Sequence, residues 1–153
     1  MKLSVFGAAL RRPSRAVALQ GDVGILASVA FYTEHGPIPA CLLSPGDRVI
    51  RRGQGPVAVR QAISVAHSGR MVRIAPDALG RARPEDFLLL PPDQRLRVRK
   101  AAGADRDGVF AVRELVDDAL FRWHEPPEPV QLVQLDFGGP EIVHAGGLEL
   151  EFG

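Results

Sequence analysis

The chain has 153 residues, of which 46% are hydrophobic and 24% charged, values typical of one globular domain that buries an ordinary core. Its single cysteine, Cys41, excludes an internal disulfide and a cysteine-cluster metal site. The apolar runs are too short to span a bilayer or to serve as a signal peptide, so we expect a cytoplasmic protein that makes no membrane contact.

Turns and strand-like segments follow one another along the chain. Residues 44–47 are expected to form a turn, because Pro45 presets its backbone, Gly46 supplies a positive φ and Asp47 can accept bonds from the turn. Apolar and polar residues then alternate, as in strands with one buried face, in residues 56–67, 71–74, 96–99, 130–137 and 147–152. The first of these segments is long enough for a pair of strands or one bent strand.

Two segments break this alternation. Residues 113–123 have helical periodicity, and we expect two or three helical turns there, ended by His124 and the prolines that follow. Residues 101–107 are rich in Ala, Gly and Asp and are expected to form a surface loop. Many short strands between Gly- and Pro-containing turns predict an all-β domain of the sandwich or barrel-like type.

The charge is balanced in total but uneven along the chain. Residues 1–103 carry 16 Lys/Arg and 7 Asp/Glu, whereas residues 104–153 carry 3 and 11. One interpretation is a basic face that binds nucleic acid. The other, which the scattered positions of the basic residues favour, is that the two halves interleave in one fold and neutralise each other.

Binding residues are suggested at two places. Arg95, Arg97 and Arg99 lie on one face of a predicted strand, either as an ordinary solvated face or as a stripe that binds anions or nucleic acid. Trp123, next to an acidic and proline-rich segment, is either an exposed recognition residue or a core anchor. The chain has one tryptophan and one tyrosine, which argues against base stacking on single strands.

Metal or thiol chemistry is not predicted. The four histidines show no spacing typical of a metal site, and they are His35, His67, His124 and His144. Cys41 has no base close to it in sequence, and we interpret it as a small apolar residue. We therefore expect no metal and no cofactor.

Six segments, taken together and in order, resemble the Hint (hedgehog/intein) domain family in its bacterial form. They are residues 36–50, 56–60, 72–80, 83–98, 111–118 and 132–147. The resemblance extends from about residue 28 to residue 152 with near-equal spacing. It implies a horseshoe of many short strands with pseudo-twofold symmetry and at most one short helix. In this interpretation residues 25–153 form the domain and residues 1–24 an N-terminal arm or leader strand.

The resemblance also implies a chemistry, which is cleavage of the domain's own chain. A thiol or hydroxyl on the first residue attacks the preceding carbonyl, an imidazole protonates the departing nitrogen, and hydrogen-bond donors stabilise the oxyanion. In this chain the nucleophile position falls near Gly24, and Gln94 stands at the position of the general-acid histidine. Gln134 and Pro140 match two further histidines of the family.

These replacements predict a degenerate member that keeps the scaffold and has lost autoprocessing. We expect it to act as a structural or interaction module with a protein partner, in which Asp93 and Gln94 are either a residual substrate-binding pair or turn residues. One alternative is an active self-cleaving domain with Ser28 as a displaced nucleophile. Another is a β domain that binds nucleic acid through a basic face.

Overall fold

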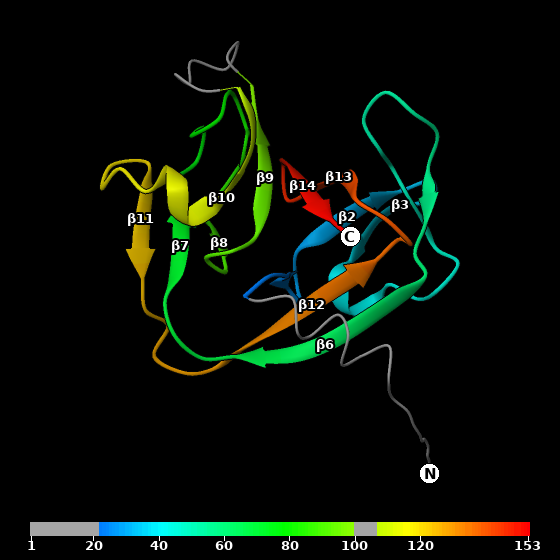
Figure 1. Ribbon diagram of the computed structural model, residues 1–153, viewed down its shortest axis with the longest axis horizontal. Coiled ribbons are helices and arrows are strands. Elements are labelled where there is room, and N and C mark those ends of the chain that lie inside the picture. Colours follow the sequence, from blue (N-terminus) through cyan, green and yellow to red (C-terminus); the bar gives the residue numbers. More distant parts are fainter. Residues whose placement is uncertain (1–21, 100–106) are drawn as a thin grey trace.

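Short antiparallel strands make up the computed structural model of this chain, which describes residues 22–99 and 107–153 (Figure 1). In chain order they are β1 (Ile25–Leu26), β2 (Ala30–Thr33), β3 (Gly36–Pro39), β4 (Arg48–Val49), β5 (Val57–Ala58), β6 (Gln61–His67), β7 (Met71–Ile74), β8 (Leu88–Leu90), β9 (Arg95–Val98), β10 (Gly108–Ala111), β11 (Phe121–His124), β12 (Val130–Asp136), β13 (Glu141–Ala145) and β14 (Leu148–Phe152). The helical residues of the described part form two 3-10 turns, η1 (Ala40–Leu42) and η3 (Val112–Leu115). The predicted all-β class is confirmed.

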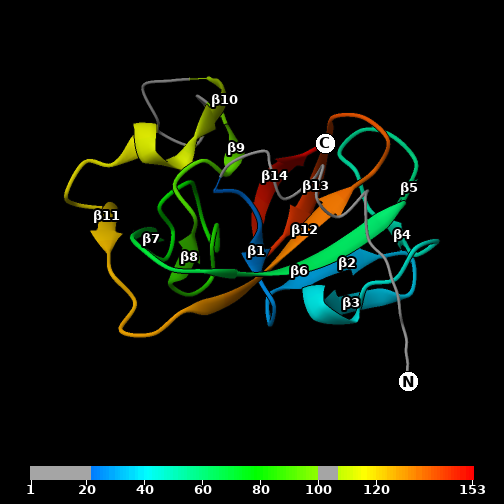
Figure 2. The same ribbon diagram turned by 60° about the horizontal axis from the view of Figure 1, so that its bottom comes forward.

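The strands form three sheets. The largest has the order β10-β9-β14-β13-β2-β4-β5, with β3 also paired to β2, and the two smaller sheets are β1-β12-β6 and β11-β7-β8. Strands β6 and β12 pair over seven residues, from Gln61 opposite Asp136 to His67 opposite Val130. Figures 1 and 2 show this ribbon running between the side of β7 and β11 and the side of β2 and β3, which gives the curved arrangement expected for the fold.

The core lies where the three sheets face one another. Each contributes fully buried side chains, for example Ile25 from β1, Leu150 from β14 and Ile74 from β7. The ring centroids of Phe31 and Phe152 are 5.7 Å apart, an ordinary distance for an aromatic pair. The alternation of apolar and polar residues in the sequence therefore corresponds to the buried and exposed faces of the sheets.

Most of the strand predictions are confirmed. The turn at residues 44–47 has Gly46 at φ +96°, and the Ser44 amide donates to the Asp47 carboxylate over 2.8 Å. Residues 56–67 form two strands rather than one, because β5 pairs with β4 in the large sheet while β6 pairs with β12. The chain changes sheets at Arg60, whose amide donates to the Asp136 carbonyl over 2.8 Å.

The helix predicted over residues 113–123 is wrong. Only its beginning is helical, as the single turn η3, and its end is strand β11. Between them the Asp117 carboxylate accepts hydrogen bonds from the amides of Ala119 (2.9 Å) and Phe121 (3.0 Å). The Phe121 carbonyl in turn accepts from the amides of Asp117 and Asp118. A side chain that takes backbone donors in this way competes with helix formation and closes a turn instead.

Some predictions fall outside the described residues. Residues 1–21 of the predicted N-terminal arm and residues 101–106 of the predicted loop are among them. Among the described residues, no helix has the length and apolar character needed to cross a membrane.

Replacing Leu150 by Ala tests the position of the core. Leu150 is 0% exposed, so its truncation leaves a cavity among the sheets and is expected to cost about 2–5 kcal/mol of unfolding free energy in urea. Leu42→Ala is the matched control, since Leu42 is 66% exposed and its loss is expected to change stability by less than about 0.5 kcal/mol. Equal effects of the two substitutions would contradict the core described above.

Replacing Asp117 by Ala tests the turn that displaces the helix. Burial slightly raises the pKa of the Asp117 carboxyl, but its bonds from the backbone amides of Phe121 and Ala119 outweigh burial and hold the pKa below its ordinary value. Such a group stabilises the fold above its unfolded pKa of about 3.9, and this contribution is lost as the pH falls through the lower folded value.

We expect Asp117→Ala to lower the unfolding free energy by about 1 kcal/mol at pH 7, the typical value of a lost cap. The difference from the unsubstituted chain should shrink toward pH 2, measured by urea unfolding at both pH values. Glu128→Ala, at an exposed position, is the control. A difference that grows on acidification would be inconsistent with the turn.

Candidate functional site

The peptide bond between Val23 and Gly24, immediately before β1, is held at both ends by side-chain amides. The Gly24 amide donates to Oε1 of Gln94 over 2.9 Å. Nε2 of Gln134 donates to the Val23 carbonyl over 3.1 Å. Each polar group of this peptide therefore has a carboxamide partner that comes from a distant part of the chain.

Gln94 is fixed by the backbone around it. It is 0% exposed and lies in the turn before β9, where its amide donates to the Pro91 carbonyl over 3.1 Å. Its Nε2 donates to two carbonyls, those of Arg95 (3.0 Å) and Glu151 (2.9 Å). Because both donors of the side chain are used there, the oxygen is left to face the Gly24 amide.

Gln134 projects from the middle of the β6–β12 ribbon. It is 3% exposed, and its Oε1 is buried without a hydrogen-bond partner among the described residues. Burial of an unpaired amide oxygen costs free energy. The hydrogen bond from Nε2 to the Val23 carbonyl opposes this cost and holds the side chain in its buried position.

Gly24 has no room for a side chain. Its φ is +132°, a value that side-chain-bearing residues rarely adopt. A Cβ built on it would lie 3.0 Å from the Val133 carbonyl oxygen and 3.3 Å from the Leu132 Cβ. The backbone therefore requires glycine at this position in its present conformation.

We call the Val23–Gly24 peptide, with its bonds to Gln94 and Gln134, the clamped peptide. Asp22, the residue before it, is also held by hydrogen bonds. The Asp93 amide donates to the Asp22 carbonyl over 3.0 Å, and the Asp22 amide lies 3.3 Å from the Asp93 carboxylate. The Asp22 carboxylate lies 3.9 Å from Nδ1 of His67, which is 8% exposed. The Asp93 carboxylate also pairs with Arg113 of η3. The segment 22–24 is thus bound by groups from three different parts of the fold: the turn before β9, strand β12 and the end of β6.

A cleft of about 550 Å³ lies beside this segment. Its lining is a mixture of amide, charged and apolar side chains: Val23, Asp93, Gln94, Arg95, Ala111, Arg113, Glu114, Gln134, Leu135, Pro140, Glu151, Phe152 and Gly153. Figure 2 shows β1, β12 and β14, three of the strands that supply or flank this lining, close together in the middle of the molecule.

Comparison with known proteins gives the family. Residues 26–152 match the family described as the Hint domain. The chain belongs to the Hint domain family. No curated protein sequence matches it.

Solved structures of inteins and intein-like proteins share the fold of this Hint domain. It is similar to a bacterial intein-like domain from Clostridium thermocellum, with a TM-score of 0.61 and 12% identity over 86% of this chain and 99% of that one. It is also similar to the gp41-1 intein (TM-score 0.56, 7% identity, 83% and 96% covered) and to the MchDnaB-1 intein (0.55, 11%, 84% and 99%). At such low identity these likenesses establish the fold alone.

The structure brings together the four positions at which the resemblance predicts replaced family residues. Gln94, Gln134 and Pro140 line the cleft of the Hint domain, and Gly24 is bonded directly to Gln94. Asp93 and Arg95 line the same cleft.

Other predicted site residues lie elsewhere. Ser28 is exposed in the turn after β1, and Cys41 is exposed on η1. Arg97 and Arg99 also lie outside the cleft lining. Trp123, on β11, is half-buried against the core, with the Arg70 guanidinium 3.7 Å from the centre of its ring. That these residues bind a partner stays a prediction.

Some groups at the site could not be predicted from the sequence. The fold brings His67 and Arg113 close to segment 22–24 and Asp93, and no local pattern marks these two residues. Within residues 22–99 and 107–153, no group of three or more His, Cys, Asp or Glu side chains is arranged to hold a metal ion. The site therefore consists of hydrogen-bonding amides around a peptide bond, with ion pairs at its edge.

Replacing Gln94 by Glu tests the clamp. The substitution preserves the shape but removes both donors and places a carboxylate against the carbonyls of Arg95 and Glu151. Burial against acceptors raises the pKa of such a carboxyl above its unfolded value of about 4.3. The cost is therefore absent below that value and grows as the pH rises, because the charge must then be buried.

We expect Gln94→Glu to lose about 3–5 kcal/mol of unfolding free energy at pH 7 and to recover most of it below pH 4. Urea unfolding at the two pH values measures both effects. Gln131→Glu, at an exposed position on β12, is the control and should be nearly neutral. A stable, pH-independent Gln94→Glu protein would show that Gln94 is not buried against these carbonyls.

Proposed function

We propose that this Hint domain no longer cuts its own chain and works as a structural or interaction module. One observation carries the proposal: the Val23–Gly24 peptide is held by two carboxamides, Gln94 and Gln134, that cannot attack it or protonate it. Gly24, at the position expected for the nucleophile, has no side chain. The site can therefore bind a peptide but lacks the groups for breaking one.

The general acid and the nucleophile each make a known contribution to the rate of such a cleavage. A positioned general acid typically contributes about 10²- to 10⁴-fold in rate, and a carboxamide has no proton to give near neutral pH. Without a thiol or hydroxyl next to the carbonyl, the acyl-transfer route is absent altogether. Hydrogen bonds to the planar peptide, such as those from Gln94 and Gln134, stabilise the ground state and do not accelerate its cleavage.

The geometry supports a structural role for the same residues. The clamp fixes segment 22–24 against β9, β12 and β14, and Gly24 allows it to bend there. In our proposal the domain holds segment 22–24 in this way and offers the adjoining surface to a protein partner.

The alternative of a displaced nucleophile finds less support. Ser28 is exposed in the turn after β1, four residues beyond the clamped peptide, and is not part of the cleft lining. Nucleic-acid binding by Arg95, Arg97 and Arg99 finds less support too. Their guanidinium groups face Glu151, Asp107 and Glu149 respectively, each within 4.0 Å.

The experiment is a fusion of a reporter protein ahead of Met1 of the full chain, incubated with and without a thiol and followed by mass spectrometry. We expect the fusion to stay intact, while a self-cleaving Hint domain treated in parallel is cut. Thiol-dependent scission near residue 24 would overturn the proposal. If scission occurs and Ser28→Ala abolishes it, the displaced-nucleophile alternative takes its place.

A further inference from the structure

A second hollow lies next to the cleft and is lined by arginines. Its volume is about 270 Å³, and its lining is Arg51, Arg52, Gln54, Arg97, Pro140, Glu141, Ile142 and Glu151. Arg97 comes from β9, whereas Arg51, Arg52 and Gln54 come from the connection between β4 and β5. We call it the arginine hollow.

Backbone contacts bring these distant residues together. Arg51 forms an isolated bridge with Val143 of β13, which pins the β4–β5 connection to the large sheet. Its Nε donates to the Gly55 carbonyl over 2.8 Å and so closes the turn that carries Arg52 and Gln54. The place of the hollow is therefore built into the fold.

The acids that line the hollow already have partners. The Glu141 carboxylate pairs with Arg51 at 3.0 Å, and that of Glu151 pairs with Arg95 at 2.7 Å. Arg97 has its acidic partner outside the hollow, since Asp107 lies 3.5 Å away and is 55% exposed. Among the described residues, no carboxylate lies within 4.0 Å of Arg52. Arg52 thus gives the hollow a positive charge that no carboxylate of the described residues neutralises, whereas Arg97 shares its charge with Asp107 through one terminal nitrogen.

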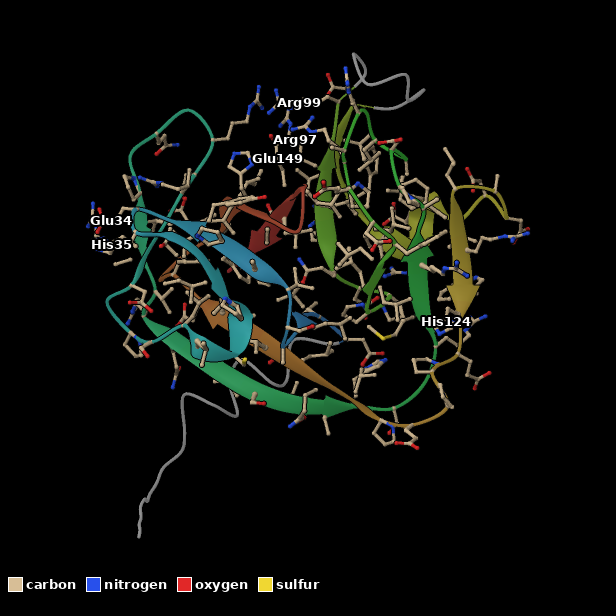
Figure 3. All side chains as sticks on the ribbon, turned by 180° about the vertical axis from the view of Figure 1, so that it is seen from behind. Glu34, His35, Arg97, Arg99, His124 and Glu149 are labelled. Carbon is tan, nitrogen blue, oxygen red and sulfur yellow. The ribbon has the colours of Figure 1, made fainter. Side chains whose placement is uncertain are left out.

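One unpaired donor belongs to a residue that lines the hollow. The Nε atom of Arg97 is buried and has no hydrogen-bond partner among the described residues. Arg99 lies outside the hollow, where it and Arg83 share the buried carboxylate of Glu149. Figure 3 shows Arg97, Arg99 and Glu149 gathered at one end of the sheet. Buried donors without partners often mark a place where a water or an anion binds.

We propose that the arginine hollow binds one phosphate dianion, either free or as the phosphoryl group of a monoester. The guanidinium groups of Arg52 and Arg97 can donate charge-assisted hydrogen bonds to phosphate oxygens, and the Gln54 amide is a further donor that lines the hollow. The carboxylates of Glu141 and Glu151 also line the hollow, and their charge disfavours a continuous run of nucleic-acid phosphates more than a single phosphoryl group.

The test is an NMR titration of the ¹⁵N-labelled full chain with inorganic phosphate at constant ionic strength. A titration with sodium chloride is the control. We expect saturable shifts confined to residues 51–54 and the neighbourhood of Arg97. Arg52→Gln, a change at an exposed position, should weaken binding about tenfold because it removes one charge-assisted contact. Arg122→Gln, which removes the same charge from exposed β11, should leave binding unchanged.

A second arm identifies the source of the phosphate. A phosphoserine peptide that binds more tightly than inorganic phosphate assigns the group to a protein side chain, and equal binding assigns it to free phosphate. Shifts no larger than those with chloride, or an Arg52→Gln protein that binds as before, would overturn the proposal. Neither outcome depends on whether the domain cuts its own chain.

Discussion

The hydrogen bond between the Gly24 amide and the Gln94 side chain is the contact on which the site depends. It connects the residue before β1 with the turn before β9. Because the Gln94 side chain also donates to the Glu151 carbonyl, the same side chain contacts β14. The three partners of this one side chain are all backbone groups in a region without solvent, where an unpaired group would cost about 1–3 kcal/mol. The Val23–Gly24 peptide therefore lies where its amide satisfies the remaining hydrogen-bond acceptor of the buried Gln94 side chain.

The same contact bears on the proposed loss of self-cleavage. A cleaving site and a clamping site both need a peptide bond held in a fixed orientation beside β12. They differ in whether the neighbouring groups can donate a proton and attack the carbonyl. Replacing an acid by an amide keeps the hydrogen bond and removes the proton transfer. In the proposed function, the fold of this Hint domain holds the Val23–Gly24 peptide without cutting it.

Prediction from the sequence succeeded where the physical cause is local. The strands at residues 71–74 and 130–137 follow from alternation on a half-buried sheet, and the turn at residues 44–47 follows from the properties of Pro, Gly and Asp. The resemblance added the order of segments and singled out residues 24, 94 and 134, and the structure shows that they meet. The helix over residues 113–123 failed because helical periodicity says nothing of the Asp117 carboxylate, which takes two backbone donors and closes a turn.

The contacts that could not be predicted from the sequence join residues that are far apart in the chain. Asp22 and Asp93 are 71 residues apart, and Arg51 meets Glu141 across 90 residues. No local pattern identifies such pairs, because they arise from the order of strands in the sheets. The arginine hollow belongs to this class as well, since the Arg95, Arg97, Arg99 stripe is visible in sequence while the contribution of the β4–β5 connection is not.

Amide hydrogen exchange at Gly24 tests the central claim most directly. If Gln94 holds this peptide in the buried clamp, the Gly24 amide exchanges as slowly as the strand amides of β14, because both are released only by large-scale opening. Exchange as fast as that of the exposed turn residue Gly53 would show that the peptide is free, and the account of a peptide held by Gln94 would be wrong.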